Sequence, residues 1–216
     1  MSSVKSSKKA TATVAAPAES KQARVMDIAL QLFLRHGYRK VSMSDIAQAT
    51  QMSRPSLYAA FANKEAIFAA MVARQRDVCT SETLQRVRDT QDLQTQLRHL
   101  FDIWVLEPVA AVIDSDNGID LVANCGVYAP AALDALYQQM EATLVRLLSP
   151  HVHANSAMSA ADLAYILRLA TTSLKASADN EAVLRRLIAG LITMALSTVQ
   201  AGNAQTPGKH KAVRGR

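Results

Sequence analysis

The chain has 216 residues, half of them hydrophobic, which is enough for a small domain fused to a larger one. Its net charge of +6 is unevenly distributed, since residues 1–80 hold 12 Lys/Arg against 5 Asp/Glu and residues 81–200 hold 8 against 13. The basic end is suited to contact a polyanion. Lysines in the terminal segment explain part of this bias, but residues 19–80 alone still carry +4.

Several classes of protein are disfavoured by composition. Residues 1–18 and 201–216 lack periodic apolar residues, and we expect both segments to be disordered. The lysines near the N-terminus are not followed by an apolar block, and the longest apolar run, residues 187–196, is about half a membrane span. Cys79 and Cys125 form no metal or disulfide pattern. We therefore expect a cytoplasmic protein without a membrane segment, metal or cofactor.

Helical periodicity and capping residues begin in the first third of the chain. Apolar spacing predicts a helix over residues 20–36, which Gly37 ends in a left-handed conformation. Ser42 with Asp45 forms a capping box at the start of a short second helix. Ser53 caps a third helix with Pro55 in its first turn, and Asn63 caps a fourth that runs to about residue 88.

The rest of the chain is also predicted to be helical. We expect an all-α fold, because no alternation typical of strands and no internal repeat is present. Ser159 with Asp162 forms a second capping box. The expected helices cover residues 92–106, 108–114, 119–126, 130–149, 159–178 and 181–200.

Residues 42–61, SMSDIAQATQMSRPSLYAAF, have the pattern of a helix-turn-helix. Apolar residues pack the two helices together, so the second helix projects rigidly and presents its N-terminal residues to a major groove. Over residues 19–79 the sequence resembles the TetR/AcrR family of transcriptional regulators. The matching positions are Leu32, Phe33, His36, Gly37, Tyr38, Ser42, Asp45, Ile46, Ala47, Met52, Ser53, Leu57, Tyr58, Phe61, Lys64, Glu65 and Phe68.

The resemblance implies which residues contact DNA. Arg54, Ser56 and Pro55 are similar to family residues that face bases, and Ser42, Ser53, Tyr58 and Lys64 to those that hold phosphates. Ser42 and Ser53 could instead act only as helix caps, without contacting DNA. Tyr58 could instead be a core residue. Gln51 stands where the family turn has glycine, so it has to adopt a left-handed conformation at a cost of about 1 kcal/mol.

Residues 80–200 are predicted to form a regulatory helical bundle. It follows the DNA-binding domain of residues 19–79, which we call the reader. The last two helices have more apolar faces than one bundle can bury, which indicates an isologous dimer. A dimer that presents two reader helices predicts a palindromic operator in double-stranded DNA. The residues expected at this interface are Leu163, Leu167, Leu174, Leu184, Leu187, Leu191 and Ile192.

The resemblance further implies a small-molecule effector bound inside the bundle, whose binding releases a repressor from its operator. Core packing is the alternative for every candidate contact, because aromatic residues at helical spacing are more often core. The predicted pocket residues are Phe101, Trp104, Asn124, Tyr128 and Tyr137.

Two other functions compete with this interpretation. An enzyme is disfavoured, because His151 and His153 lack further metal ligands and neither a nucleophile motif nor a phosphate loop is present, so we expect no catalytic residues. A nonspecific architectural DNA-binding protein would bind through its basic ends, with an affinity set by salt rather than sequence.

Overall fold

The computed structural model describes residues 20–111, 115–153, 156, 158–177 and 180–204, and every regular element in these ranges is a helix. The expected disorder of residues 1–18 and of the end of the chain lies outside the described residues. The helices are α1 (Lys21–His36), α2 (Met43–Thr50), α3 (Arg54–Ala60), α4 (Lys64–Arg86), α5 (Leu93–Phe101), a π-helix η1 (Asp102–Leu106), α6 (Glu107–Ala110), α7 (Asp116–Ala123), α8 (Cys125–Tyr128), α9 (Pro130–Leu148), α10 (Ala160–Ser177) and α11 (Glu181–Ala204).

The predicted caps define the starts of the early helices. The Ser42 hydroxyl accepts the amide of Asp45 at 3.3 Å, and the Asp45 carboxylate accepts the Ser42 amide at 2.8 Å, which confirms the capping box. Hydrogen bonds from the Ser42 groups lower the pKa of the Asp45 carboxyl. Ser53 and Asn63 cap α3 and α4 as predicted. Local hydrogen bonding therefore places these helix starts where the sequence indicated.

Two residues end helices with positive φ. Gly37 has φ 86° and ψ 139°, so the left-handed conformation predicted there is wrong in ψ, although this region is also open almost only to glycine. Gln51 has φ 56° and ψ 31°, which confirms the left-handed conformation expected at that turn. Gln51 is the one non-glycine residue with positive φ among the described residues.

Replacing Gln51 by glycine should stabilise the protein by about 1 kcal/mol, because glycine adopts the left-handed region without a Cβ clash. Chemical denaturation of the wild type and of Gln51→Gly measures this difference. Gln48→Gly is the matched control, since Gln48 lies within helix α2, where glycine costs roughly 0.5–1 kcal/mol. Equal effects at both positions would contradict the argument.

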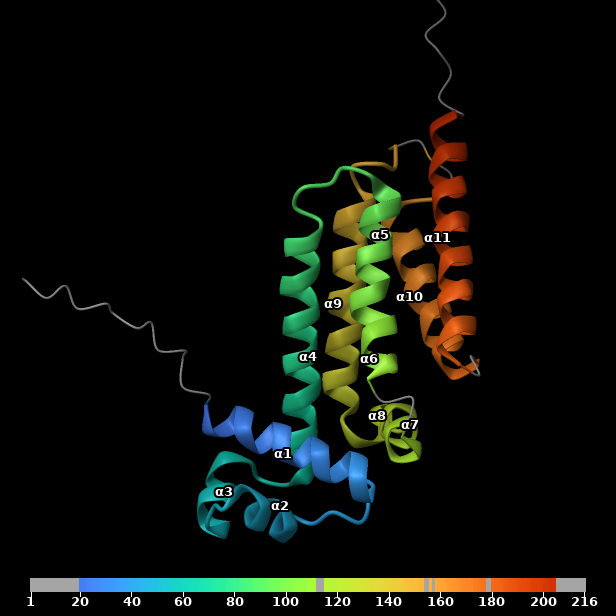
Figure 1. The fold of residues 1–216 in the computed structure, drawn as a ribbon. Coiled ribbons are helices and arrows are strands. Elements are labelled where there is room, and N and C mark those ends of the chain that lie inside the picture. The colour runs from blue at the N-terminus through green and yellow to red at the C-terminus, as the bar shows by residue number, and fades with distance from the viewer. Residues whose placement is uncertain (1–19, 112–114, 154–155, 157, 178–179, 205–216) are drawn as a thin grey trace, which may run out of the picture.

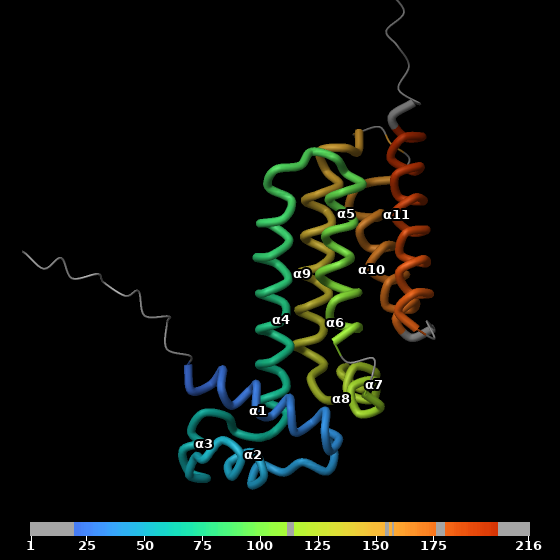
Figure 2. The backbone as a smooth tube through the Cα atoms, viewed as in Figure 1, coloured from blue at the N-terminus to red at the C-terminus, as the bar shows by residue number. Residues whose placement is uncertain are grey.

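The helices surround two separate hydrophobic cores, which α4 connects (Figure 1). The first lies between α1, α2, α3 and the start of α4, and its most buried side chains include Phe33, Ile46 and Leu57. The second lies between α5, η1, α9, α10 and α11, with the end of α4. Figure 2 shows α4 and α9 running alongside each other and α11 at the edge of the bundle, where α10 packs on it.

A junction of α7 and α8 with the end of α1 joins the small first core to the bundle. The Tyr128 ring stacks on Tyr38 with centroids 3.9 Å apart, and Arg39 donates to the Tyr128 hydroxyl at 3.4 Å. The side chains of Ser115 and Asn117 donate to the carbonyl of Leu34 at 3.3 and 3.0 Å. The first core therefore extends beyond residue 79 and takes side chains from α7, α8 and the loop after them.

Some helix boundaries differ from those expected. The segment predicted as one helix over 92–106 changes to a π-helix at Asp102, and the helix expected at 119–126 is divided at Asn124 into α7 and α8. Helix α11 continues to Ala204, into the segment expected to be disordered. By length and composition alone its stretch Glu181–Gly202 is apolar enough to cross a membrane, yet only 28% of the tested window is buried in the protomer.

Candidate nucleic-acid interface

The pair α2 and α3 is held by apolar side chains that face the first core. Ile46 and Leu57 are fully buried, and Ala47 is 4% exposed where α2 packs under α3. The amide of Met52 donates to the Ala47 carbonyl at 3.0 Å and tightens the turn between the helices. These contacts fix α3 against α2 and leave the opposite side of α3 in solvent (Figure 1).

The outward side of α3 carries most of the predicted DNA contacts. Arg54, Pro55 and Ser56 are all exposed, as is the capping residue Ser53. Tyr58 is 52% exposed, so the core position weighed as its alternative is excluded. The structure therefore brings five of the seven predicted residues onto one exposed helix of seven residues and its cap. Whether they touch DNA stays a prediction.

The two serines already have partners within the protein. The Ser42 hydroxyl lies 2.7 Å from the Asp45 carboxylate, and the Ser53 hydroxyl lies 2.8 Å from that of Ser56. Both are exposed, so each has room for a phosphate oxygen in addition to its cap. Capping and phosphate contact remain compatible at both positions.

Lys64 has a structural role that the sequence did not reveal. Its ammonium donates to the carbonyls of Tyr38 at 2.7 Å and Val41 at 3.0 Å, and it lies 4.3 Å from the centroid of the Tyr38 ring. Two of its three N–H groups are thus used to fix the loop between α1 and α2. One donor remains for a phosphate.

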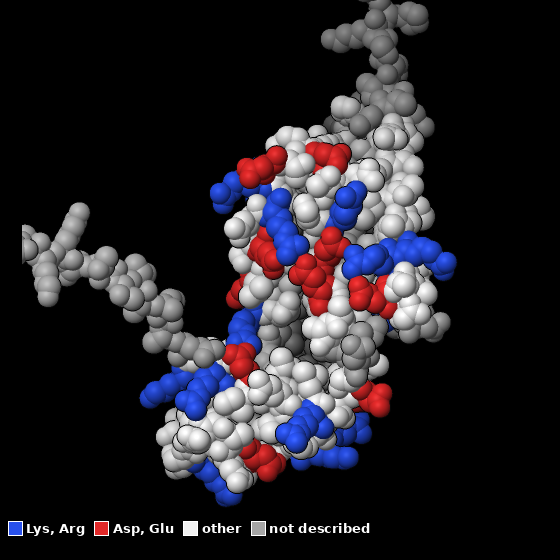
Figure 3. Space-filling model, viewed as in Figure 1, with Lys and Arg blue, Asp and Glu red and all other residues white. Residues whose placement is uncertain are grey.

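A groove beside α2 was also missed by sequence reasoning. Residues from the end of α1, the following loop, α2 and α7 form its walls. The basic residues among them are Arg35, His36 and Lys40. Figure 3 shows mostly Lys and Arg with a few acidic residues at the reader end of the molecule, while the bundle surface carries both signs side by side. The signal in the sequence that could have indicated this groove is the basic cluster at the end of the first helix.

Tyr38 packs the first core rather than facing DNA. It is 4% exposed and contacts the rings of Phe33 and Phe68, with centroids 4.9 and 5.6 Å away. Burial, with a smaller effect of the Glu65 carboxylate, raises the pKa of Tyr38. This residue therefore sits between the reader and α8.

Comparison with known proteins agrees with this geometry. The sequence profile described as "Bacterial regulatory proteins, tetR family" matches residues 25–71, which include α2 and α3. The chain is 29% identical over 110 residues to the HTH-type transcriptional repressor ComR of Escherichia coli, a match covering 50% of this chain and 51% of ComR. It is 29% identical over 82 residues to the HTH-type transcriptional activator FasR of Mycolicibacterium smegmatis, covering 38% of this chain and 37% of FasR.

Residues 25–71, the part of the chain that holds α2 and α3, match the model of the TetR family.

Solved structures show that the likeness of fold extends over most of the chain. A putative TetR-family regulator from Syntrophomonas wolfei aligns with a TM-score of 0.66 at 15% identity, over 82% of this chain and 95% of the other. The fatty acid degradation regulator FadR of Bacillus halodurans aligns with a TM-score of 0.58 at 14% identity, over 87% and 95%. Because the matches to the curated relatives span about half of ComR and just over a third of FasR, the sequence comparison bears on the reader more than on the bundle.

The five residues predicted to line an effector pocket do not gather in one place in this structure. Phe101 and Trp104 are buried in the second core, whereas Tyr128 stacks on Tyr38 in the first. Asn124 donates to the Asp120 carboxylate of its own helix at 2.8 Å. Tyr137 is half-buried on α9, with Arg168 5.9 Å from its ring centroid. Tyr128 and Asn124 are therefore corrected to residues of the junction, where local stacking and hydrogen bonding engage them.

The predicted dimer residues divide into two groups. Leu163, Leu167, Leu184 and Ile192 are between 1% and 7% exposed in the second core, so they are corrected to core residues that a partner cannot reach. Leu174, Leu187 and Leu191 are half-buried. The periodicity alone did not say which of the apolar faces turns inward.

Over the part of the chain that the structure describes, no group of three His, Cys, Asp or Glu side chains is placed to hold a metal ion.

Proposed function

We propose that the protein is a cytoplasmic, homodimeric, sequence-specific repressor that a small-molecule effector releases from a palindromic operator. The observation that carries the proposal is the set of exposed residues Ser53, Arg54, Pro55, Ser56 and Tyr58 on α3 and its cap. On the opposite side of the helix, Leu57 is fully buried. A short helix held in this way can enter a major groove with its N-terminal residues toward the bases. The longer of the two curated matches is to a repressor, which favours repression over activation.

A surface on α10 and α11 supports the dimer. Large apolar side chains are exposed there, with Tyr165 at 48%, Ile166 at 46% and Leu169 at 43% on α10, and Met194 at 67% on α11. We call these four, together with Leu187 and Leu191, the α10–α11 face. The α11 members are three or four residues apart and share one side of the helix.

The same helix has further features that favour close approach of a partner. A Cβ added to Gly190 would meet nothing within 4 Å, although glycine costs roughly 0.5–1 kcal/mol inside a helix. Because most of the apolar window of α11 is not buried in the protomer, a second copy would provide the missing cover. A dimer built on this face presents two α3 helices to one duplex.

Arg54→Ala should weaken the preference for the operator, with a loss of about 1–3 kcal/mol in discrimination between the operator and random DNA. Arg54→Lys should restore little of it, because lysine keeps the charge but lacks the two-pronged donor geometry that guanine recognition uses. The operator is first selected from random duplexes with the wild type. Fluorescence anisotropy on operator and scrambled duplexes then measures both affinities.

Tyr58→Phe is the matched comparison, since it removes one exposed hydroxyl and nothing from the core. It should lower the affinity for all duplexes to a similar degree, as expected of a phosphate contact. Lys64→Ala is less suitable, because it also removes both bonds to the loop after α1. If the wild type selects no sequence, and its affinity follows salt alone, the protein is the architectural DNA-binding protein instead.

A further inference from the structure

Lys175 on α10 directs its charged end into the helical bundle. The residue is half-buried, and its ammonium donates to the backbone carbonyl of Trp104 at 3.4 Å. Lysines at surfaces usually lay the alkyl stem on apolar groups and keep the ammonium in water. Here the arrangement is reversed, since the ammonium bonds to η1 and the ionisable groups that affect it are on α4 and α8.

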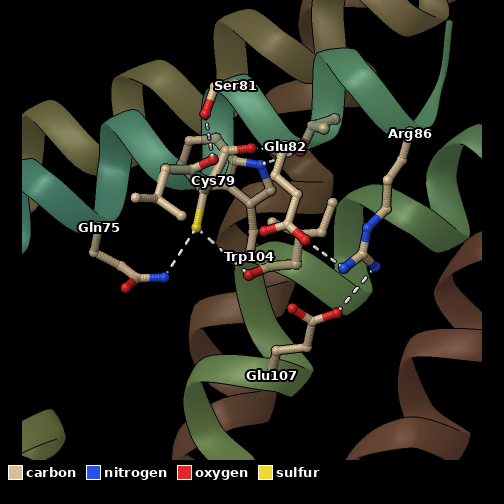
Figure 4. A network of polar contacts seen from close by, with 10 residues as sticks. Gln75, Cys79, Ser81, Glu82, Arg86, Trp104 and Glu107 are labelled. Atoms are coloured by element: carbon tan, nitrogen blue, oxygen red, sulfur yellow. Dashed lines mark hydrogen bonds and ion pairs between the residues drawn. The ribbon is translucent and has the colours of Figure 1, made fainter. Parts of the chain in front are cut away.

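The carbonyl that receives this ammonium belongs to the π-helix η1. Within η1 the amide of Glu107 donates five residues back, to the Asp102 carbonyl, and π-turns of this kind are frequent at functional sites. The neighbouring Ile103 carbonyl accepts from the thiol of Cys79 at 3.5 Å (Figure 4). The indole of Trp104 donates to the hydroxyl of Thr83 at 2.9 Å. Side chains from α4 and α10 thus converge on two successive carbonyls.

The acidic groups of this region are engaged elsewhere. Figure 4 shows Arg86 between the carboxylates of Glu82 and Glu107, on the outer side of the same network. The ionisable groups that affect Lys175 are the thiols of Cys79 on α4 and Cys125 on α8. Over the described residues, Lys175 has no carboxylate partner at ion-pair distance.

An ammonium in this position is held at a cost. Burial lowers the pKa of Lys175 to about 8, which means that the bundle disfavours its charged form. Burial also raises the pKa of both nearby thiols, so they are neutral near pH 7 and provide no counter-charge. A bound anion would supply the missing partner.

We propose that the effector is an apolar acid whose carboxylate pairs with the Lys175 ammonium beside Trp104. This inference rests on the proposed function in one respect, since it names the chemical class of the effector that the regulator would sense. The apolar body of the acid would lie against the second core, of which Trp104, Ile103 and Leu174 are members or neighbours.

Trp104 makes the test direct, because the chain contains one tryptophan. The purified full-length protein is titrated with carboxylates from butanoate to hexadecanoate and with benzoate, and each acid is matched by the alcohol of the same carbon skeleton. Tryptophan emission reports binding. We expect at least one acid to bind about 10- to 100-fold more tightly than its alcohol, the range expected of a charge-assisted hydrogen bond.

Lys175→Met keeps an unbranched side chain that is one atom shorter and removes the charge, so it should bring acid and alcohol to equal affinity. Arg98→Met is the control, since Arg98 is an exposed cation of the same bundle, and it should leave the preference unchanged. Circular dichroism confirms that each variant is folded. Equal binding of acid and alcohol by the wild type, retention of the preference by Lys175→Met, or no binding of any acid at millimolar concentration would each overturn the inference.

Proton uptake on binding is a second measurement. A ligand held by apolar packing alone would not cause it. At about pH 9 most Lys175 side chains are neutral, and pairing with a carboxylate restores the charged form. Calorimetry in buffers of different ionisation enthalpy should therefore show proton uptake by the wild type and none by Lys175→Met. If the protein selects an operator but binds no acid at Lys175, only the proposed effector class is wrong. If the acid binds at Lys175 and no operator is selected, the proposed regulator is wrong and the site stands.

Discussion

The double variant Leu169→Glu, Met194→Glu is expected to be a folded monomer with about 10²- to 10⁴-fold lower affinity for the selected operator. Both side chains are exposed in the protomer, at 43% and 67%, so the substitutions leave the second core intact. In a dimer they would bury carboxylates against an apolar partner surface. A monomer binds one half-site and loses the gain that comes from linking two readers.

Sedimentation velocity and anisotropy on the operator measure the two consequences, and a single half-site duplex should bind wild type and variant alike. Val78→Glu is the matched control, because Val78 on α4 is 47% exposed and lies outside the α10–α11 face. It should remain dimeric with full affinity. A monomeric double variant that binds the full operator as tightly as the wild type would refute the bivalent reader.

Lys175→Met is expected to stabilise the protein by up to about 3 kcal/mol at pH 7, the largest gain that we expect from a single substitution. Burial moves the pKa of Lys175 from 10.5 to about 8, and each unit corresponds to about 1.36 kcal/mol. Because the folded pKa lies below the unfolded one, the unfolded chain binds more protons between these two values. The penalty is therefore complete below about pH 8, decreases as pH rises toward 10.5, and is absent above it.

Urea denaturation at about pH 7 and about pH 10, at one protomer concentration, checks both the size and the sign. The difference between wild type and Lys175→Met should be smaller at the higher pH. Lys40→Met, at an exposed lysine, should change stability little at either pH. A destabilised Lys175→Met variant at pH 7 would show that the ammonium has a structural partner, and would contradict the burial cost on which the effector inference draws.

The starts of the reader helices could be predicted from the sequence because they depend on neighbours within a few residues. Ser42 with Asp45, Ser53 with Ser56, and Asn63 with Ala66 form bonds over three residues, and the sequence alone displays that spacing. The left-handed conformation of Gln51 was expected from the resemblance, because the family has glycine at that position, and the structure confirms it. The outward row on α3 follows from Leu57 as the one buried residue of that helix.

Only the tertiary structure decided which apolar residues face inward and which residues meet across the chain. Leu163 and Leu167 differ from Ile166 and Leu169 in burial alone, because α10 has apolar residues on both sides and neighbouring helices select one. Tyr128 meets Tyr38 and Lys175 meets Trp104 over 71 or more positions, through contacts that no local spacing encodes. Local hydrogen bonds and periodicity thus determined the helices and the reader, whereas long-range packing determined the exposed face, the junction and the buried charge.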